Sequence, residues 1–292
     1  MRGKIMKGIA GFYYVHAEDG CTYACRARGI FRKDKYKPLV GDNVVISVTD
    51  TKDMEGSLDE ILPRSNELVR PAAANADQAL IIFAAADPEP NLVLLDRFLV
   101  MMEYQNLPSV ICFNKADLID EAEKKRLSAI YEPVRCPVIF SSTVTGEGIR
   151  EIRSCLDKKT SVVAGPSGAG KSSIANSLQD KIRMETGEIS KKLGRGRHTT
   201  RHAEIIPLGG QTYLMDTPGF SSLYLPEIGE EKLWYYFPEF REPEQFCRFQ
   251  GCRHRAEPDC GVIEAVNKGA VSRSRYDSYV LLHDELKEGR KY

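Results

Sequence analysis

The order of two nucleotide-binding motifs limits what this chain can fold into more than any other feature. The stretch "GPSGAGKS" at residues 165–172 fits G-x-x-x-x-G-K-[ST], a loop that wraps a polyphosphate. A second motif, "NKAD" at residues 114–117, precedes it, although α/β nucleotide-binding domains usually carry the phosphate loop after their first strand. A sheet tolerates such a permutation because its pieces keep their positions when the termini are joined and the chain is reopened at surface loops. The order therefore predicts a circularly permuted domain.

The phosphate loop stands in the expected strand–loop–helix context. A β-branched run precedes it, and "SSIANSLQ" follows as a helix. Lys171 would reach the β/γ-phosphates and Ser172 would hold Mg²⁺. The alternatives are a plain glycine-rich turn and a nucleophile elbow, but Ala169 occupies the last glycine position of an elbow. Phosphate contacts are expected from Gly165, Pro166, Ser167, Gly168, Ala169, Gly170, Lys171, Ser172 and Ser173.

The "NKAD" motif indicates which base is bound. At the end of the apolar run "SVICF", Asp117 can accept hydrogen bonds from N1–H and the exocyclic amine of guanine, donors that adenine does not present in that arrangement. Asn114 can reach the acceptor side of the base, and Lys115 can lie along its face. A second strand, "PVIFSST", ends in Ser141 and Ser142, whose backbone could contact O6. We therefore expect GTP or GDP as the ligand, with a helix start at Asp117 as the alternative for the tetrapeptide.

Magnesium ligands are expected on both sides of the last strand of this domain. "DTPG" at residues 216–219 supplies Asp216, suited to bind Mg²⁺ through water, and Gly219, whose N–H can sense a γ-phosphate. Upstream, we expect Thr200 to complete the magnesium shell, with Thr199 as the alternative. The expected magnesium set is thus Ser172, Thr200 and Asp216.

The expected water-orienting glutamine is missing. Phe220 follows the Asp-x-x-Gly segment, and a phenyl ring cannot position water by hydrogen bonding. His198 is the candidate in its place, and an exposed loop histidine is the alternative. The expected catalytic set is His198, Lys171 and Thr200, with slow intrinsic hydrolysis that responds to a partner.

A Cys/His cluster lies near the carboxy terminus. Cys247, Cys252, His254 and Cys260 fall within fourteen residues, and three thiolates with one imidazole make a closed, structural Zn²⁺ site. We expect a domain with few apolar residues whose folding depends on the metal; unrelated buried cysteines with a surface histidine are the alternative. Three arginines interleave with the ligands and are expected to face an anion: Arg248, Arg253 and Arg255.

The pattern of apolar and polar residues changes twice along the chain, which predicts three domains in a multi-domain α/β protein. Alternating β-branched and aromatic residues predict a small all-β barrel over residues 1–65, and a proline-containing stretch follows as a plausible linker. Apolar runs alternating with helical patterns predict a parallel sheet with helices over residues 66–222. Helices are expected at 91–105, 121–131, 147–158 and 272–287. Residues 223–292 are expected to form a small, mostly helical domain.

Net charge and cysteine content constrain the function less than the motifs do. The 41 Lys and Arg balance the 41 Asp and Glu, so net charge selects no partner, although residues 26–37 and 181–202 are basic. No membrane span or secretory signal is visible, and eight cysteines in a cytosolic protein favour thiols or a metal site over disulfides. Cys21 and Cys25 are expected to be strand residues. We expect a cytoplasmic monomer without a membrane partner.

Taken together, the barrel pattern, the permuted order, "GPSGAGKS", "RHTT", "DTPGF" and C-x4-C-x-H-x5-C resemble the bacterial ribosome small-subunit-dependent GTPase A family over essentially the whole chain. The resemblance implies an amino-terminal OB-fold, a permuted GTPase core and a zinc domain. It implies binding to the small ribosomal subunit and its rRNA during late maturation, GTPase activity raised by the subunit, and release after hydrolysis. His198 matches the position suggested for the catalytic histidine of the family.

A different class of function is also compatible with the motifs. The chain could be an RNA-binding assembly scaffold that holds GTP as a structural ligand, which Phe220 would permit. Acceleration of GTP turnover by small subunits separates the two hypotheses. A GTPase acting on a membrane or a protein cargo is disfavoured by the flanking barrel and zinc motifs.

Overall fold

The computed structural model describes residues 1–28, 31, 37–68, 72–186, 204–216, 225 and 228–289, without the side chains of residues 180–186. The predicted roles of His198, Thr199, Thr200, Gly219 and Phe220 therefore fall outside the described residues. The chain divides into two compact units. One comprises Met1–Ala79, Ile152–Ala164 and Ser172–Ser221, and the other Leu80–Glu151, Gly165–Lys171 and Ser222–Tyr292.

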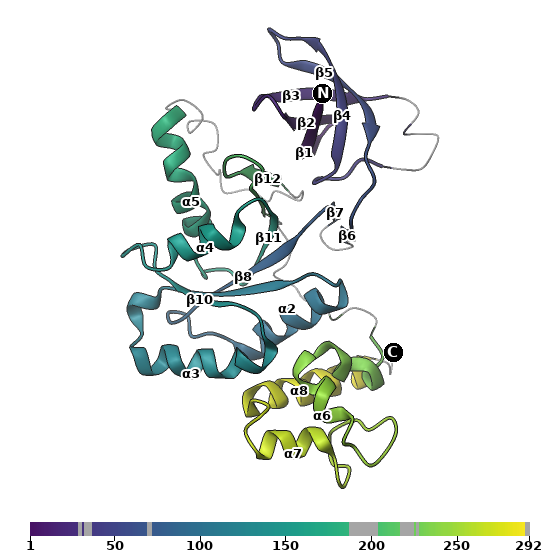
Figure 1. Ribbon diagram of the computed structural model, residues 1–292, viewed down its shortest axis with the longest axis vertical. Coiled ribbons are helices and arrows are strands. Elements are labelled where there is room, and N and C mark those ends of the chain that lie inside the picture. Colours follow the sequence, from purple (N-terminus) through teal and green to yellow (C-terminus); the bar gives the residue numbers. More distant parts are fainter. Residues whose placement is uncertain are drawn as a thin grey trace. The chain divides into compact units, whose positions relative to one another are not determined.

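The amino-terminal strands form a closed barrel in the order β1-β2-β3-β5-β4 (Figure 1). Strands β3 and β5 pair in parallel and the other neighbours are antiparallel. Alternate side chains fill the barrel, so Ile5, Val15 and Leu58 are fully buried. The predicted OB-type barrel is thereby confirmed. Its strands are β1 (Arg2–Ile9), β2 (Phe12–Ala17), β3 (Thr22–Ala27), β4 (Asn43–Asp50) and β5 (Glu55–Ile61).

The segment after the barrel is anchored rather than loose. The guanidinium of Arg64 donates to both carboxylate oxygens of the fully buried Asp42, at 2.7 and 2.8 Å. Asn75 donates to the carbonyl oxygen of Gly41 at 3.1 Å. Gly41 has φ +95°, and a Cβ there would lie 2.0 Å from the carbonyl oxygen of Ala74. The expected linker therefore packs closely on a barrel turn, and it contains the short pair β6 (Glu67–Leu68) and β7 (Ala73–Ala74).

A six-stranded sheet carries the predicted α/β pattern, in the order β10-β9-β8-β11-β13-β12. The pairs β9–β10 and β11–β13 are parallel, and β12 joins β13 antiparallel. Every residue of β8 is buried, as expected of a strand covered on both faces. The strands are β8 (Gln78–Ala84), β9 (Ser109–Asn114), β10 (Val138–Ser141), β11 (Thr160–Ala164), β12 (Glu204–Pro207) and β13 (Tyr213–Asp216).

The predicted helices of this domain are confirmed, with side chains that define two of their starts. Asn91 caps α2 by accepting from the N–H of Leu94 at 2.9 Å, and Asp120 caps α3 by accepting from Glu123 at 2.8 Å. The helices are α2 (Leu92–Tyr104), α3 (Glu121–Tyr131), α4 (Ile149–Leu156) and α5 (Lys171–Thr186), with the short 3-10 turns η1 (Ala116–Leu118) and η2 (Glu132–Val134).

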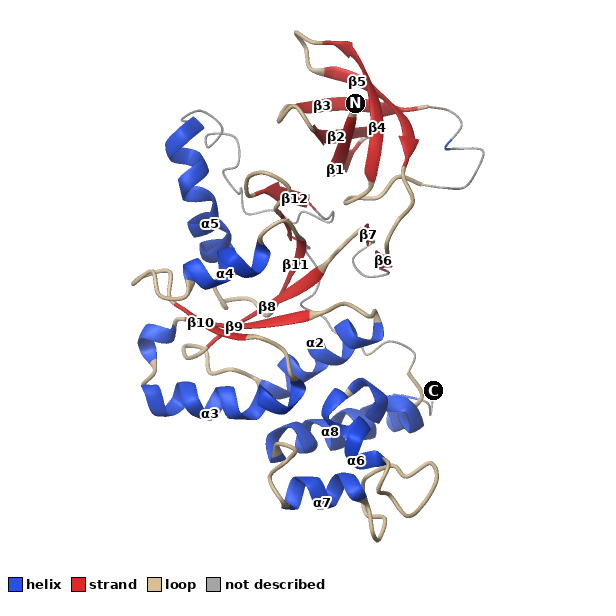
Figure 2. Cartoon of the chain, in the orientation of Figure 1, coloured by secondary structure: helices blue, strands red, loops and turns tan. Residues whose placement is uncertain are grey.

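The described carboxy-terminal residues are helices and loops, drawn blue and tan in Figure 2. They comprise η4 (Glu230–Tyr236), η5 (Pro238–Phe240), α6 (Arg241–Glu244), α7 (Gly261–Asn267) and α8 (Arg273–Gly289). The expectation of few apolar residues is wrong, because Leu233, Phe237, Phe240, Val262 and Tyr279 are fully buried in one cluster. This region therefore has a core of its own in addition to its metal-ligand set. Among the described residues, no helix is long and apolar enough to cross a membrane.

Candidate nucleotide and metal sites

The phosphate loop has a backbone shape that only glycine permits. Strand β11 ends at Ala164, and Gly165 turns the chain with φ +135°. A Cβ on Gly165 would lie 2.0 Å from the carbonyl oxygen of Ile82 in β8. Gly168 and Gly170 also have positive φ, +81° and +87°, before α5 begins at Lys171. The loop thus brings backbone N–H groups to a helix N-terminus, a favourable place for phosphate.

The fold brings the base motif and the phosphate loop together. The side-chain amide of Asn114, at the end of β9, donates to the carbonyl oxygen of Ala169 at 3.0 Å. A Cβ on Gly170 would lie 2.1 Å from the same amide nitrogen. Two motifs far apart in the sequence, in an unusual order, are therefore joined by a direct hydrogen bond between residues 55 positions apart.

The side chain of Asn114 is oriented by two buried side chains, Ser141 and Cys112. The hydroxyl of Ser141 donates to Oδ1 of Asn114 at 3.3 Å, and the Sγ of Cys112 lies 3.2 Å from that hydroxyl. All three side chains are buried, and burial raises the pKa of the Cys112 thiol to about 12. Because these bonds define which side of the Asn114 amide is the donor, they fix the direction in which it presents its groups. Sequence reasoning assigned Ser141 a backbone contact and missed this side-chain role.

The remaining residues of "NKAD" project from a short turn. Lys115 has φ +61°, and its ammonium donates to the carbonyl oxygen of Asp87 in the loop between β8 and α2. Asp117 lies in η1 and is exposed. The carboxylate of Asp117 is therefore accessible from solvent.

Ser142 organises the loop that follows β10. Its hydroxyl accepts from the N–H groups of Val144 and Thr145, both at 3.2 Å, and its N–H donates to the carbonyl oxygen of Glu147 at 3.0 Å. Lys124 of α3 donates to the carboxylate of Glu147 at 2.7 Å. The loop after β10 is therefore attached to the helix that follows "NKAD".

In the phosphate loop the lysine side chain bonds to the loop backbone, whereas the serine side chains are exposed. The ammonium of Lys171 donates to the carbonyl oxygens of Gly165 and Pro166, at 2.9 and 2.6 Å. Ser167, Ser172 and Ser173 are exposed. The three serine side chains are thus exposed at the loop, whereas the ammonium of Lys171 is bonded to carbonyl oxygens of the same loop.

Asp216 is the last residue of β13, at the edge where the parallel strand β11 also ends. It pairs in register with Val163 of β11 on one side and with Glu204 of β12 on the other. Magnesium prefers oxygen ligands from carboxylates, hydroxyls and phosphates. The carboxylate of Asp216 and the hydroxyl of Ser172 fit that preference.

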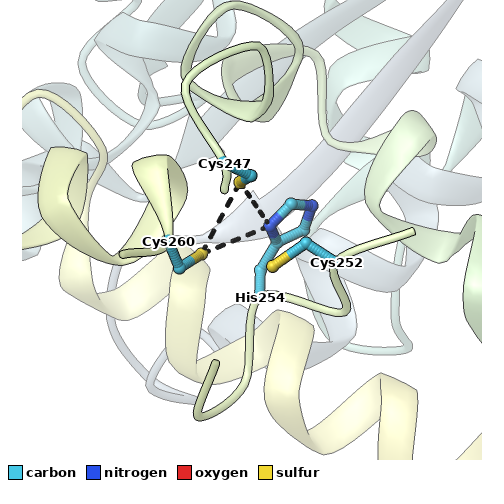
Figure 3. A group of neighbouring side chains, drawn as sticks. All are labelled: Cys247, Cys252, His254 and Cys260. Carbon is cyan, nitrogen blue, oxygen red and sulfur yellow. Dashed lines mark hydrogen bonds between the residues drawn. The ribbon is translucent and has the colours of Figure 1, made fainter. Parts of the chain in front are cut away.

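The four predicted zinc ligands converge on one point, as Figure 3 shows. Nδ1 of His254 lies 3.5 Å from Sγ of Cys247 and 3.4 Å from Sγ of Cys260, and those two sulfurs are 3.9 Å apart. The ligand atoms of all four residues, Cys252 included, lie within 4.8 Å of one another. Bonds of about 2.3 Å to sulfur and about 2.0 Å to nitrogen give tetrahedron edges of about 3.5–3.8 Å. The set therefore fits a tetrahedral zinc ion.

Burial favours the neutral imidazole that binds a metal. It lowers the pKa of His254 to about 4, and it raises the pKa of the Cys252 thiol to about 12, so a thiolate there needs a nearby cation. The hydroxyl of Tyr276 donates to the carbonyl oxygen of His254 at 2.9 Å, and that of Tyr279 to Arg253 at 2.6 Å. Helix α8 thus holds the loop that presents the imidazole.

The arginines around the cluster only partly match expectation. Arg248 and Arg253 are exposed, and Arg248 pairs with Asp259 at 3.0 Å. Arg255 donates to both carboxylate oxygens of Asp284 in α8, at 2.5 and 3.1 Å. Arg255 therefore has a structural partner instead of facing an external anion.

A buried ion triad near these helices was not predicted. Arg275 of α8 donates to Asp96 of α2 at 2.7 Å and to both oxygens of Glu239 in η5, at 2.7 and 3.2 Å. All three side chains are at most 2% exposed, and burial raises the pKa of Asp96. The available signal was an aspartate inside the apolar stretch "LVLLDRFLV". The triad ties α2 to the carboxy-terminal helices.

Comparisons with known proteins agree with this geometry. The RsgA GTPase family model matches residues 61–226, and the RsgA N-terminal domain model matches residues 2–56. A "Small ribosomal subunit biogenesis GTPase RsgA" of Agathobacter rectalis is 57% identical, with both chains covered in full. One of Caldanaerobacter subterraneus is 50% identical over 100% of this chain and 97% of its own length.

Two solved structures resemble the chain over nearly its whole length. YjeQ from Thermotoga maritima superposes with a TM-score of 0.82 at 35% identity, covering 98% of each chain. YloQ, described as a circularly permuted GTPase, superposes with a TM-score of 0.77 at 40% identity, covering 98% of this chain and 95% of its own. The permuted order is therefore confirmed as a property of the fold. Because its GTPase model spans more than half of the sequence and these relatives match it end to end, the chain belongs to the RsgA GTPase family.

Proposed function

We propose that the chain binds GTP with Mg²⁺, hydrolyses it to GDP and phosphate, and uses that reaction to time its departure from a maturing small ribosomal subunit. The observation that carries the proposal is the hydrogen bond from Asn114 to the phosphate loop, which supports base recognition and phosphate binding at one site. Membership of the family makes the chain a GTP hydrolase of ribosome biogenesis. The scaffold alternative is not favoured, since the matching family model and relatives are GTPases.

Guanine recognition falls to the two loops beside Asn114. Asp117 would accept from N1–H and the exocyclic amine, and Asn114 would face the acceptor side of the base. Lys115 would lie along the ring, with its ammonium steadied by Asp87. Backbone N–H groups near Ser141 and Ser142 would serve O6.

Phosphate binding falls to residues 165–173. Backbone N–H groups of the loop would surround the phosphate oxygens, and Lys171 would exchange the carbonyls of Gly165 and Pro166 for the β/γ-phosphates. Magnesium would be held by Ser172, Asp216 and Thr200, or Thr199 in place of the last. When bound, the ion neutralises charge that develops on the phosphates. Gly219 would sense the γ-phosphate.

Hydrolysis needs a group that orients the attacking water. His198 is the proposed group, because the phenyl ring of Phe220 cannot hydrogen-bond to water in this way. Turnover would be slow in isolation and raised by the small subunit. Substituting His198 with Ala tests the assignment: subunit-stimulated turnover should fall at least about tenfold, and unchanged turnover would remove His198 from the mechanism.

The flanking regions would provide the rest of the function. Cys247, Cys252, His254 and Cys260 would hold one structural zinc ion, and the barrel would contact rRNA through a strand face, as OB-folds do. We propose domains at residues 1–65, 66–222 and 223–292, supported by family models at 2–56 and 61–226. The protein would work as a cytoplasmic monomer without a membrane partner.

The proposal is tested by GTP turnover with and without purified small ribosomal subunits. We expect subunits to raise the rate and ATP to be a poor substrate. Equal rates in both conditions would contradict the proposed role, and large subunits serve as the matched control.

A further inference from the structure

A lysine of the barrel pairs with a carboxylate on a sheet strand next to the nucleotide site. Nζ of Lys7, in β1, lies 3.4 Å from Oε1 of Glu204, the first residue of β12. Both side chains are about one-third exposed, so the pair is partly shielded but reachable by solvent ions. The same ammonium lies 5.0 Å from the centre of the Tyr14 ring. Lys7 and Glu204 belong to the same compact unit.

Glu204 stands directly beside the proposed magnesium ligand. In the antiparallel register of β12 and β13 it is opposite Asp216. Opposed residues of such a pair point to the same face with Cβ atoms about 4.5–5.5 Å apart, and like charges there repel. The charge of Glu204 therefore acts on the carboxylate of Asp216, and Lys7 offsets that charge.

Other contacts keep the barrel strands at this position. Nδ1 of His16, in β2, lies 3.1 Å from the hydroxyl of Tyr213, in β13. Nζ of Lys4 lies 5.5 Å from the centre of the Tyr213 ring. Tyr213 is three residues before Asp216 on the same strand. Lys7 thus belongs to a part of the barrel whose neighbouring residues, Lys4 and His16, contact Tyr213 of β13.

We propose that Lys7, acting through Glu204, sets the affinity of the nucleotide site for Mg²⁺. Lys7 is a positioning residue: it neutralises Glu204 and lowers the negative potential at Asp216. Removing its charge strengthens magnesium binding, whereas removing the charge of Glu204 weakens it. The inference rests on the magnesium role of Asp216 in the proposed function.

The test is a magnesium titration of the release rate of fluorescent GDP at low ionic strength. One unit charge at this range changes the affinity for a divalent ion about threefold. We expect Lys7→Gln to lower the half-saturating magnesium concentration about threefold and Glu204→Gln to raise it about threefold. Lys7→Arg should match the unmodified protein, and the double variant Lys7→Gln/Glu204→Gln should lie close to the unmodified protein, because the two charge losses act in opposite directions. Both shifts should shrink in ~0.5 M KCl.

The opposite signs separate this role from a structural one, because loosening the barrel would not move the two variants in opposite directions. The matched control is Lys52→Gln, a charge loss at an exposed barrel turn, which should change nothing. Suppose that Asp216→Asn weakens magnesium binding, as the proposed function predicts. If Lys7→Gln and Glu204→Gln then shifted the half-saturating magnesium concentration in the same direction, or not at all, this inference would be wrong while the magnesium role of Asp216 would stand. An unchanged magnesium dependence in Asp216→Asn would overturn the magnesium assignment in the proposed function and this inference with it.

Discussion

The phosphate loop and the zinc cluster both gather ligand-binding atoms around one point, but they are built in opposite ways. The phosphate loop uses backbone groups, and its shape depends on missing side chains at Gly165 and Gly170. The zinc cluster uses side chains, and its backbone is left-handed at two residues that are not glycine, His254 (φ +53°) and Asp259 (φ +54°). The first should be sensitive to an added methyl group, and the second to a lost side chain.

Loss of a zinc ligand should have the largest effect. Cys260 is buried and precedes α7, so Cys260→Ser leaves the other ligands without a complete shell. We expect zinc content to fall and the free energy of unfolding of the carboxy-terminal region to drop by more than ~3 kcal/mol. Metal analysis and hydrogen exchange over residues 228–289 measure both.

The control for that variant is Cys25→Ser, a buried barrel thiol that belongs to no ligand set. It should keep the full zinc content. A Cys260→Ser protein with one zinc per chain and unchanged exchange would show that the four residues are not the metal shell.

The second-largest effect is expected from an added methyl group in the phosphate loop. In Gly170→Ala the new Cβ displaces the amide of Asn114, so both base and phosphate binding suffer. GDP affinity should fall about 100-fold, or ~2.8 kcal/mol. A fluorescent GDP titration measures it.

Gly168→Ala sharpens the comparison, since that position also has positive φ but its nearest neighbour, a Pro88 carbon, is 3.8 Å away. Backbone strain alone costs ~1–2 kcal/mol. If both alanines weakened binding equally, the contact of Gly170 with Asn114 would not matter.

Removing the Ser141 hydroxyl should have a smaller effect. Ser141→Ala leaves Oδ1 of Asn114 without that donor and should weaken GDP binding about fivefold, or ~1 kcal/mol. Ser161 of β11 is the matched control, because its buried hydroxyl accepts from Gln78 instead. Equal effects of Ser141→Ala and Ser161→Ala would indicate a general loss of stability and not a role in orienting Asn114.

The smallest effect concerns the backbone of the zinc loop. Burial opposes ionisation of Glu257, but N–H groups of Arg255, Arg253 and Ala256 donate to its carboxylate and lower its pKa to about 2. Because the folded pKa is below the unfolded one, this stabilisation is complete above about pH 4.5. It is lost as the pH falls toward about 2.

Unfolding of the unmodified protein and of Glu257→Gln at several pH values checks this prediction. The advantage of the unmodified protein should be present at pH 6 and decline below about pH 4.5. An advantage that grew on acidification would contradict the assigned cause.

Local chemistry explains what the sequence could predict. The phosphate loop, "NKAD" and the cysteine spacing each carry their meaning within a few residues, and helix starts at Asn91 and Asp120 are local capping signals. The predicted fold class followed from the order of these pieces and from the alternation of strands and helices. The comparisons confirm it.

Features that depend on distant partners could not be predicted. The parallel pairing of β3 with β5, the triad of Arg275 with Asp96 and Glu239, and the orientation of Asn114 by Ser141 all join residues far apart in the chain. The apolar core around Phe237 and Tyr279 was missed because part of it, Leu233 of η4 and Phe240 of η5, comes from short 3-10 turns, which have no regular period over a long window.

The central claim is that the base held by the loop at 114–117 and the phosphates held by the loop at 165–172 belong to one guanine nucleotide. The most direct measurement is nucleotide competition by calorimetry for the unmodified protein and for Asp117→Asn. The oxygen of an asparagine can accept from N1–H while its NH2 donates to the 2-carbonyl of xanthine, but the side chain cannot accept from both N1–H and the exocyclic amine of guanine. We predict that the unmodified protein prefers GTP over ATP and XTP and that Asp117→Asn prefers XTP. Equal binding of ATP and GTP by the unmodified protein, or an unchanged preference in Asp117→Asn, would contradict the account.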